Sequence, residues 1–267
     1  MDLRVDADAA LVTGGGELAA SPWQLDGRIA LVTGASAGLG ERFVRVLHRA
    51  GAHVVATARR ADRLAVVVAE CGDRIDVIPG DIADPDFRTS LVDAVARHGH
   101  LDILLNNAGT NDDGPLEDET LDEIVRVVDV NLVSVIDLCR LTAPLLFAAP
   151  AATVINVASI YGVVASPGPM AGYNATKGAI VNFTRHLAAQ WGGRGVRVNA
   201  IAPGYFPTEM TGHFEDQSLT SSICKRTLLA RVPELEEIDG PLLFLASDAS
   251  SYVTGHVLVV DGGWTAV

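Results

Sequence analysis

Tyr173 and Lys177 lie four residues apart in the segment Gly-Tyr-Asn-Ala-Thr-Lys-Gly, a spacing that could support proton transfer. On a helix, residues four apart occupy one face, so an ammonium would lie beside a phenol. A free tyrosine titrates near pH ~10, and lowering its pKa by ~3 units needs roughly 4 kcal/mol of preference for the phenolate. A unit charge ~4 Å away supplies about that much at an effective dielectric of ~20, but only ~1 kcal/mol in bulk water. The pair therefore predicts chemistry only inside a cleft; on a solvated helix face it would be an ordinary surface pair.

A regular alternation of apolar runs and helical stretches must position this pair. We expect strands at residues 29–33, 53–57, 75–79, 103–105, 153–157, 196–201 and 257–260. We expect helices near residues 39–50, 61–70, 86–98, 119–147, 171–191 and 234–247. Strands that alternate with helices form right-handed βαβ units, so the sequence predicts an α/β fold with one doubly wound parallel sheet.

The length of 267 residues and the 49% hydrophobic content suit one large α/β domain, which we place at residues 25–267. Residues 1–24 look like a flexible extension that could contribute an oligomer contact. Their Leu-Val-Thr-Gly at 11–14 echoes the same letters at 31–34. We do not interpret the first copy as a phosphate loop, because no long helix follows it.

Charge and cysteine usage limit the possible partners and compartments. A formal net charge of −13 argues against nucleic acid and against an anionic membrane surface. The three cysteines, Cys71, Cys139 and Cys224, are widely spaced, which favours reduced core thiols over a disulfide or a metal site, so no metal is expected. The N-terminus lacks the pattern of a signal peptide, and prolines interrupt the apolar stretch at 141–158. We expect a cytoplasmic protein.

A glycine-rich segment, Thr33-Gly34-Ala35-Ser36-Ala37-Gly38-Leu39-Gly40, joins the first expected strand to the first expected helix. Glycines there allow a tight turn, a close approach of the backbone to a pyrophosphate, and packing of helix on strand. The helix N-terminus offers unpaired N–H groups to phosphates. The segment predicts nucleotide binding rather than a purely structural turn. The expected contacts are Gly34, Ser36, Ala37, Gly38, Leu39 and Gly40.

The end of the second strand indicates which dinucleotide binds. An acidic residue at this place accepts hydrogen bonds from the ribose of NAD. This chain has Ala58 followed by Arg59, and a guanidinium suits a 2′-phosphate. We expect NADP(H) to be preferred, with NAD(H) possible; the alternative is that Arg59 and Arg60 cap a solvated loop. Asp81 and Ile82 would flank the adenine.

Further segments occur in a fixed order along the chain: GDIAD at 80–84, NNAG at 106–109, Asn131, Ser159, YNATK at 173–177, RVNAIAPG at 197–204 and VDGGW at 260–264. Together with TGASAGLG at 33–40, this series resembles the short-chain dehydrogenase/reductase family over residues 25–264. The resemblance implies a single-domain Rossmann-like sheet of about seven strands in the order 3-2-1-4-5-6-7.

The resemblance also implies roles for the catalytic residues. Tyr173 would be the general acid in ketone reduction and the general base in alcohol oxidation. Lys177 would lower the pKa of Tyr173 and hold the nicotinamide ribose. Ser159 would donate a hydrogen bond to the substrate carbonyl, and Asn131 would hold a water that links Lys177 to solvent.

Binding residues follow from the same resemblance. The remaining cofactor contacts would be Asn107, Ala108, Gly109, Pro203, Gly204 and Thr208, besides Tyr173 and Lys177. Residues 205–232 would form a lid over the substrate. The substrate pocket would be lined by Thr110, Ile160, Tyr161, Met170, Tyr205 and Phe206.

One departure from the family pattern lies between Ser159 and Tyr173, where thirteen residues stand instead of the usual twelve. The segment Ser166-Pro167-Gly168-Pro169-Met170 carries the extra residue. We expect it to bulge outward and to leave Ser159 in register with Tyr173; a shift of the helix start would separate them.

The sequence thus predicts an oxidoreductase that transfers a hydride between NADP(H) and a neutral ketone or secondary alcohol. Two alternatives stay open: an NAD(P)-dependent isomerase or dehydratase on the same fold, and a cofactor-binding regulator without catalysis. The long helices at 119–147 and 171–191 resemble those that pair between subunits in the family, and the C-terminal tail through Trp264 often forms a second interface. A homotetramer is expected, with a dimer as the second choice.

Overall fold

One parallel sheet organises the computed structural model, which describes residues 21–112, 114–214 and 217–267. Its strands are β1 (Ile29–Thr33), β2 (His53–Ala58), β3 (Ile75–Pro79), β4 (Ile103–Asn106), β5 (Thr153–Val157), β6 (Arg197–Pro203) and β7 (Val257–Val260). They pair in the order β3-β2-β1-β4-β5-β6-β7, which confirms the predicted fold class and strand order. Residues 1–20 of the expected extension lie outside the described residues.

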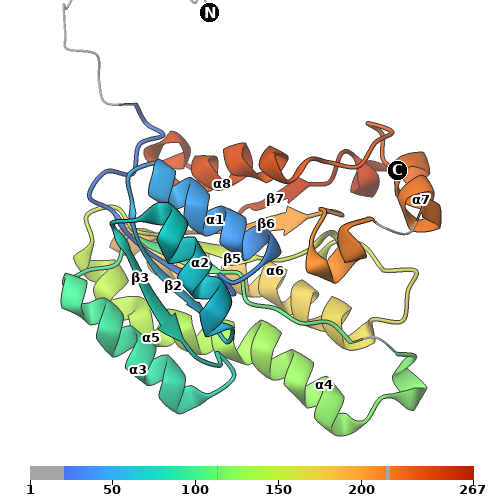
Figure 1. The fold of residues 1–267 in the computed structure, drawn as a ribbon, viewed down its shortest axis with the longest axis horizontal. Coiled ribbons are helices and arrows are strands. Elements are labelled where there is room, and N and C mark those ends of the chain that lie inside the picture. Colours follow the sequence, from blue (N-terminus) through green and yellow to red (C-terminus); the bar gives the residue numbers. More distant parts are fainter. Residues whose placement is uncertain (1–20, 113, 215–216) are drawn as a thin grey trace, which may run out of the picture.

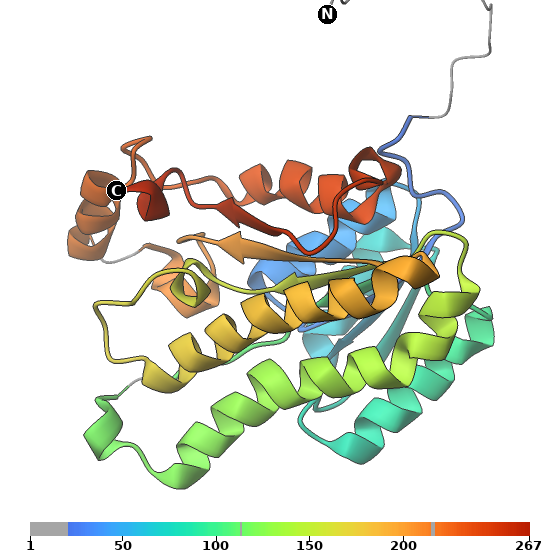
Figure 2. The ribbon, with the colours of Figure 1, turned by 180° about the vertical axis from the view of Figure 1, so that it is seen from behind.

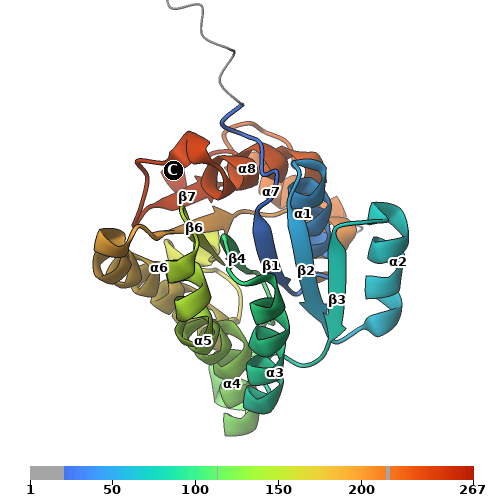
Figure 3. The same ribbon diagram turned by 90° about the vertical axis from the view of Figure 1, so that its left-hand side faces the viewer.

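Helices cover both faces of the sheet (Figures 1 and 3). They are α1 (Gly38–Arg49), α2 (Ala61–Cys71), α3 (Pro85–Val95), α4 (Leu121–Val128), α5 (Ser134–Ala148), α6 (Ala171–Trp191), α7 (Gln217–Arg226) and α8 (Asp239–Ala246). One buried cluster joins α1, α2 and α8 to the sheet through residues such as Phe43, Leu64 and Leu242. A second joins α3, α5 and α6 to the opposite face. The covering on both faces explains why the central strands are apolar along their whole length.

The order of the strands places a crevice between β1 and β4. Chain connections run to opposite sides of the sheet at this point, because β2 follows β1 on one side and β5 follows β4 on the other. In doubly wound sheets, ligands bind beyond the carboxyl ends of the strands at such a reversal. The glycine-rich turn after β1 and the Asn-Asn-Ala-Gly segment after β4 meet there.

The expected helix at 119–147 consists of three parts. Thr120 and Glu123 form a reciprocal capping box, so α4 begins at Leu121. A π-helical turn, Asp129–Val133, then separates α4 from α5. Such turns widen the backbone locally and often lie at functional sites. Asn131 lies within this turn, whose presence the apolar pattern of the segment did not reveal.

The combined run from Leu121 to Ala148 is long and apolar enough to cross a membrane by length and composition alone. In the structure, α5 packs on the sheet through Leu138, Cys139 and Leu146, all buried. Figure 2 shows α5 beside α6 on the same face of the molecule. The run therefore serves as a core helix, with a second side that remains exposed.

Candidate active site

The glycine-rich turn between β1 and α1 is packed against the segment that follows β4. Gly34 has a φ of +69°, and a Cβ there would lie 2.8 Å from the Cα of Ala108. A Cβ on Gly40 would lie 2.1 Å from the carbonyl oxygen of Gly34. Asn107 holds the turn, because its Nδ2 donates to the carbonyl of Thr33 at 2.9 Å. Only glycine fits at Gly34 and Gly40, and the predicted Asn107 braces the turn from the neighbouring strand.

The N-terminus of α1 is open for an anion. Ala37 occupies the N-cap position, and no side chain caps the first N–H groups. Such groups, together with the positive end of the helix dipole, form a phosphate site. A Cβ on Gly38 would lie 3.1 Å from the side chain of Thr208, so the start of the lid rests on this turn. The expected residues Ser36, Ala37, Gly38 and Leu39 thus fit a dinucleotide pyrophosphate.

Two arginines follow β2 beside this turn, and their surroundings differ. Arg59 is exposed, and no ion pair or hydrogen bond within the described residues involves its guanidinium. Arg60 donates from Nε to Ser36 Oγ at 3.3 Å and from Nη1 to Glu209 Oε2 at 2.9 Å. Arg63 lies 3.9 Å from the other oxygen of Glu209. Besides the predicted Arg59, the structure therefore shows a second cation, Arg60, beside Ser36. The Glu209 carboxylate pairs with Arg60.

Lys177 and Tyr173 lie on α6 beneath the carboxyl end of β5. Lys177 is 4% exposed, and its Nζ donates to the carbonyl oxygen of Val157 at 2.8 Å. The same Nζ lies 5.6 Å from the centre of the Tyr173 ring. Ser159, two residues after Val157 and also buried, lies near enough to Tyr173 for its hydroxyl to lower the pKa of the phenol. The predicted serine, tyrosine and lysine therefore form one enclosed group.

Burial has the largest influence on the protonation of this group, so the net pKa of Tyr173 is raised, whereas the sequence predicted a net lowering by Lys177. Burial raises the pKa of Tyr173, and the nearby Ser159 hydroxyl offsets only part of that rise. Burial lowers the pKa of Lys177 to about 8. The expected electrostatic effect assumed a charge directly beside the phenol, whereas Nζ points to the Val157 carbonyl. Desolvation is then the larger influence on both groups.

Asn131 connects the group to the loop after β4. Its Oδ1 accepts a hydrogen bond from the Thr110 amide at 2.8 Å, and its Nδ2 donates to the Thr110 carbonyl at 2.7 Å. Nδ2 also reaches Thr176 Oγ1 at 3.2 Å, and Thr176 donates in turn to the Tyr173 carbonyl at 2.8 Å. Asn131 therefore clamps the loop to α6. Thr110, expected in the substrate pocket, contributes its backbone to this clamp.

Asp112 fixes the start of α6, and sequence reasoning missed it. Its carboxylate is 4% exposed and accepts hydrogen bonds from the amides of Gly172 at 2.7 Å and Tyr173 at 3.1 Å. A negative charge at this position also interacts favourably with the positive end of the helix dipole. Pro167, Gly168 and Pro169 are exposed, so the extra residue bulges outward as expected. The contact between Ser159 and Tyr173 is preserved.

An aromatic cluster surrounds the phenol of Tyr173. It contains the predicted Ile160, Tyr161, Met170 and Tyr205, together with Trp264. The hydroxyl groups of Tyr161 and Tyr205 lie 2.6 Å apart, and the rings of Tyr205 and Trp264 are 5.1 Å apart. Burial is the main cause of a raised pKa at Tyr161, so its hydroxyl stays protonated. An apolar wall with a few fixed hydroxyl groups suits a small organic substrate.

The segment that follows β6 and the C-terminal tail line a cavity of about 160 Å³ next to this cluster. Phe206, predicted in the pocket, lines it, although most of its side chain is buried in the core. Trp264 also lines it, and its Nε1 is buried with no hydrogen-bond partner among the described residues. Trp264 is therefore buried within the chain itself.

The remaining predicted contacts lie around the rim of the crevice. Ile82 is buried, and its carbonyl accepts a hydrogen bond from Arg88 at 2.8 Å, which holds the loop containing Asp81. A Cβ on Gly204 would lie 2.9 Å from the Cα of Asp261, so the turn after Pro203 is tightly packed. A Cβ on Gly109 would lie 3.5 Å from Asn131 Oδ1 and 3.7 Å from Lys177 Nζ, beside the group of Ser159, Tyr173 and Lys177.

The site residues that the sequence did not predict mainly form hydrogen bonds with other groups of the protein. Asp112, Thr176 and Arg60 are examples, and Thr33 is another, since its hydroxyl accepts hydrogen bonds from the amides of Asn107 and Ala108. No spacing signal marks Asp112 or Thr176, because their partners are distant in sequence. Arg60 was identifiable from the sequence as a second cation next to Arg59.

Comparison with known proteins agrees with this geometry. Residues 34–265 match the family model described as Enoyl-(Acyl carrier protein) reductase. Gluconate 5-dehydrogenase of Gluconobacter oxydans is 38% identical over 250 residues, covering 91% of this chain and 96% of that protein. The 3-oxoacyl-[acyl-carrier-protein] reductase of Thermotoga maritima is 32% identical over 244 residues, covering 90% of this chain and 98% of that protein.

Solved structures resemble the chain equally well. The crystal structure of a gluconate 5-dehydrogenase from Burkholderia cenocepacia in complex with NADP and tartrate is 35% identical in sequence. Its TM-score is 0.86, and the match covers 92% of this chain and 98% of that one.

Proposed function

The chain belongs to the short-chain dehydrogenase/reductase family, and we propose that it transfers a hydride between NADP(H) and a ketone or secondary alcohol. The observation that carries the proposal is the enclosed group of Ser159, Tyr173 and Lys177. This group lies at the carboxyl edge of the sheet, on the same edge as the glycine cradle after β1. Relatives that are dehydrogenases and reductases acting on alcohol and carbonyl groups support this reaction class.

The open N-terminus of α1 would hold the pyrophosphate. Gly34 and Gly40 leave room for the close approach of a phosphate, and Asn107 keeps the turn rigid. When bound, the nicotinamide supplies or accepts the hydride. Lys177 Nζ, which lies near Gly109, would donate hydrogen bonds to the hydroxyl groups of the nicotinamide ribose.

The arginines after β2 favour NADP over NAD. Arg60 already binds a carboxylate of Glu209, and Arg59 and Arg63 lie on either side of it in sequence. A 2′-phosphate carries more negative charge than a carboxylate and accepts bidentate hydrogen bonds from guanidinium groups. We propose that the phosphate takes the place of Glu209 on Arg60, with Arg59 as a further partner. The related Burkholderia structure binds NADP.

Proton transfer falls to Tyr173. In the reducing direction its hydroxyl donates the proton to the substrate oxygen, while Ser159 donates a second hydrogen bond to that oxygen. A protonated Lys177 stabilises the phenolate that results. Because burial favours neutral Lys177, the Val157 carbonyl helps to keep the amine protonated through its hydrogen bond.

The aromatic cluster favours a neutral substrate of modest size. The hydroxyl pair of Tyr161 and Tyr205 can bind a substrate oxygen. Arg231 lines the cavity, but Glu237 pairs with it through two hydrogen bonds of 2.6 Å. No free cation in the described lining residues thus demands an anionic substrate. Polyhydroxy ketones and cyclic ketones both meet this description.

A substrate panel assayed with both cofactors tests the proposal. The purified protein is mixed with NADPH or NADH and with a keto-sugar acid, a neutral keto-sugar, a cyclic ketone and an acetoacetyl thioester. We expect NADPH to be consumed with at least one ketone, in equal amount to the alcohol formed, and NADH to support a slower rate. Conversion of a substrate without net NADPH consumption would instead identify an isomerase or dehydratase. Binding of NADPH with no turnover across the panel would support the regulator.

A further inference from the structure

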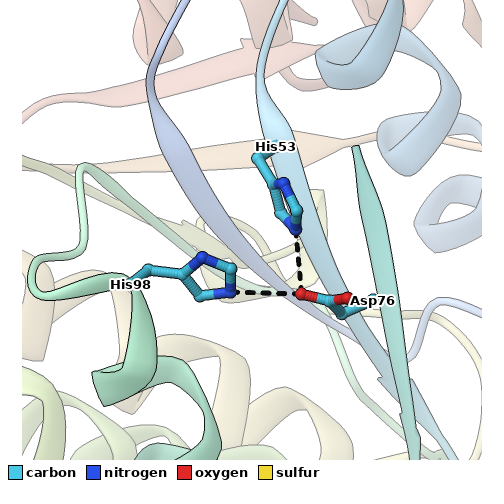
Figure 4. Close-up of side chains that lie close together, drawn as sticks. All are labelled: His53, Asp76 and His98. Carbon is cyan, nitrogen blue, oxygen red and sulfur yellow. Dashed lines mark hydrogen bonds and ion pairs between the residues drawn. The ribbon is translucent and has the colours of Figure 1, made fainter. Parts of the chain in front are cut away.

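A second cluster of reactive side chains lies at the opposite edge of the sheet from the active site. His53 is the first residue of β2, Asp76 is the second residue of β3, and His98 ends the short helical turn Ala96–His98 that follows α3. Figure 4 shows the two imidazole rings directed toward the Asp76 carboxylate from different elements. The catalytic residues lie beyond the carboxyl ends of the strands, whereas this cluster lies at their amino ends.

The three side chains converge on one oxygen atom. His53 Nε2 lies 2.8 Å from Asp76 Oδ2, and His98 Nε2 lies 3.1 Å from the same oxygen. One candidate ligand atom from each residue lies within 4.8 Å of the other two. The imidazole rings are 4.6 Å apart and tilted by 54°, so their ring nitrogens can face a common point.

This arrangement matches the donor set of a zinc-type ion. Zinc binds imidazole nitrogen and carboxylate oxygen at about 2.0–2.2 Å with tetrahedral geometry, which places neighbouring ligand atoms about 3.3 Å apart. The observed separations of 2.8 and 3.1 Å need to widen by only a few tenths of an ångström. All three side chains are partly exposed, with 28%, 52% and 22% of the surface of His53, Asp76 and His98 accessible. They can therefore move apart by this amount, and water can supply a fourth ligand.

The backbone sets the positions of the three proposed ligand residues. His53 and Asp76 project from one face of the sheet, because Asp76 is in register with Val55, two residues beyond His53 on the same strand. His98 approaches from the helix that covers this face. We propose that His53, Asp76 and His98 form a binding site for one late first-row divalent cation such as Zn²⁺, Co²⁺ or Ni²⁺. The bound ion would tie the edge strand β3 to β2 and to the end of α3.

No motif in the sequence indicates this site, and the proposal departs from the expectation that the chain binds no metal. The ligands are separated by 22 residues or more, so they form none of the short spacings that mark a metal site in sequence. The net charge of −13 also raises the local concentration of cations around the protein. Because the site lies at the far edge of the sheet, we assign it a stabilising role and no role in hydride transfer.

Titration of the untagged, metal-free protein with Co²⁺ tests this proposal. Tetrahedral Co²⁺ absorbs visible light much more strongly than hydrated Co²⁺, so the spectrum reports on coordination. We expect one equivalent of Co²⁺ to bind, Zn²⁺ to displace it, and Zn²⁺ to raise the melting temperature. In His53→Gln, His98→Gln and Asp76→Asn, the affinity should fall by more than about tenfold. His100→Gln is the matched control, because His100 lies at the same edge but pairs with Asp102.

Reductase activity and the melting temperature without metal are measured for each variant, so that a folding defect is recognised. If a variant folds poorly, competition between Zn²⁺ and a chromophoric chelator on the wild-type protein still counts the sites. Absence of a stoichiometric site in that competition would overturn the proposal. Unchanged Co²⁺ affinity in folded His53→Gln and His98→Gln would overturn it as well, by placing the ion elsewhere.

Discussion

At the scale of residues, the central pair is held in an environment that opposes its charged forms. Burial raises the pKa of Tyr173 and lowers that of Lys177 to about 8. Keeping an ammonium beside the tyrosine that we propose transfers the proton therefore costs folding stability. Penalties of this kind are common at functional sites, where activity and stability compete.

Replacement of the buried amine should expose this competition. A pKa lowered from 10.5 to about 8 corresponds to about 3 kcal/mol of destabilisation below pH 8. Lys177→Met removes that penalty but leaves the Val157 carbonyl without its donor, which costs about 1–3 kcal/mol. We expect the variant to be inactive and yet as stable as the wild type or about 1 kcal/mol more stable at pH 7.

The pH dependence of unfolding supplies the check. The unfolded chain keeps the Lys177 proton up to its ordinary pKa, whereas the folded chain releases it near pH 8. The wild type should therefore gain stability relative to Lys177→Met as pH rises from 8 toward 10.5. Lys225→Met is the control, since Lys225 is exposed on α7. A fixed difference between wild type and Lys177→Met at every pH would refute the penalty.

Glu209 should weaken the preference for NADP, because its carboxylate competes with the 2′-phosphate for Arg60. Both side chains of the pair are nearly half exposed, so the ion pair itself is worth less than about 1 kcal/mol. We expect Glu209→Gln to raise the ratio of kcat/KM for NADPH over NADH about two- to fivefold. Arg60→Ala should lower that ratio. The fall in the same ratio for Arg59→Ala measures how much Arg59 contributes to the preference for NADPH.

Glu70→Gln is the matched control for charge, because Glu70 pairs with Arg45 on α1, away from the glycine turn. If Glu209→Gln changes the kcat/KM values for NADPH and NADH equally, Glu209 does not compete with the phosphate.

At the scale of elements, α6 presents Tyr173, the proposed proton donor, and the loop after β4 sets its position. Asp112 on that loop caps α6 at Gly172 and Tyr173, and Asn131 in the π turn ties the same loop to Thr176. Three segments distant in sequence thus determine where the phenol lies. Sub-ångström placement of a catalytic group has large effects on rate.

Loss of the Asp112 cap should therefore reduce turnover more than cofactor binding. Removal of a helix cap costs about 0.5–2 kcal/mol of stability. For Asp112→Ala we expect this loss together with a fall in kcat of about tenfold or more, with the NADPH dissociation constant little changed. Asp112→Asn, which keeps an acceptor oxygen, should recover part of both.

Asp84→Ala is the control, because Asp84 caps α3 through the Asp86 amide, next to the expected adenine site and not at the Ser159–Tyr173–Lys177 group. It should lower stability without lowering kcat. Equal losses of kcat in Asp84→Ala and Asp112→Ala would show that the effect is one of global stability alone.

The sequence predicts features that depend on residues close together in the chain better than features that depend on contacts between distant residues. The strands and most helices follow from apolar periodicity, and Gly34, Ser159, Tyr173 and Lys177 follow from motifs that adjoin those elements. The π turn at Asn131 and helix α7 in the lid are not visible in such patterns. Asp112 acts on backbone groups sixty residues away. The pKa direction at Tyr173 also escapes the sequence, because it depends on burial and on where Lys177 Nζ points.

At the scale of the whole molecule, α4, the π turn and α5 expose apolar side chains that the described residues do not cover. Leu121, Val125, Val133 and Ile136 are 72%, 45%, 41% and 42% exposed. Large exposed apolar patches mark interaction surfaces. We propose that these side chains pack against a second copy of the chain in a homotetramer, rather than against a lipid.

Charge placed among these side chains should dissociate the assembly. Light scattering after size-exclusion chromatography should give four times the 28.0 kDa mass of the chain for the wild type. The double variant Val125→Asp, Ile136→Asp should give a dimer or monomer. Val66→Asp is the control, since Val66 is equally exposed on α2. A monomeric wild type would contradict the proposed assembly.

The most direct test of the account is the turnover of Tyr173→Phe with NADPH and a ketone that the wild type reduces. The substitution keeps the ring in the aromatic cluster and removes only the hydroxyl that donates the proton. We predict that kcat falls by about 10²–10⁴-fold while the NADPH dissociation constant stays within about twofold of the wild type. Tyr205→Phe, which removes a hydroxyl from the same cluster, should retain most of the wild-type kcat. Turnover by Tyr173→Phe within a few-fold of the wild type would contradict the central claim that Tyr173 transfers the proton.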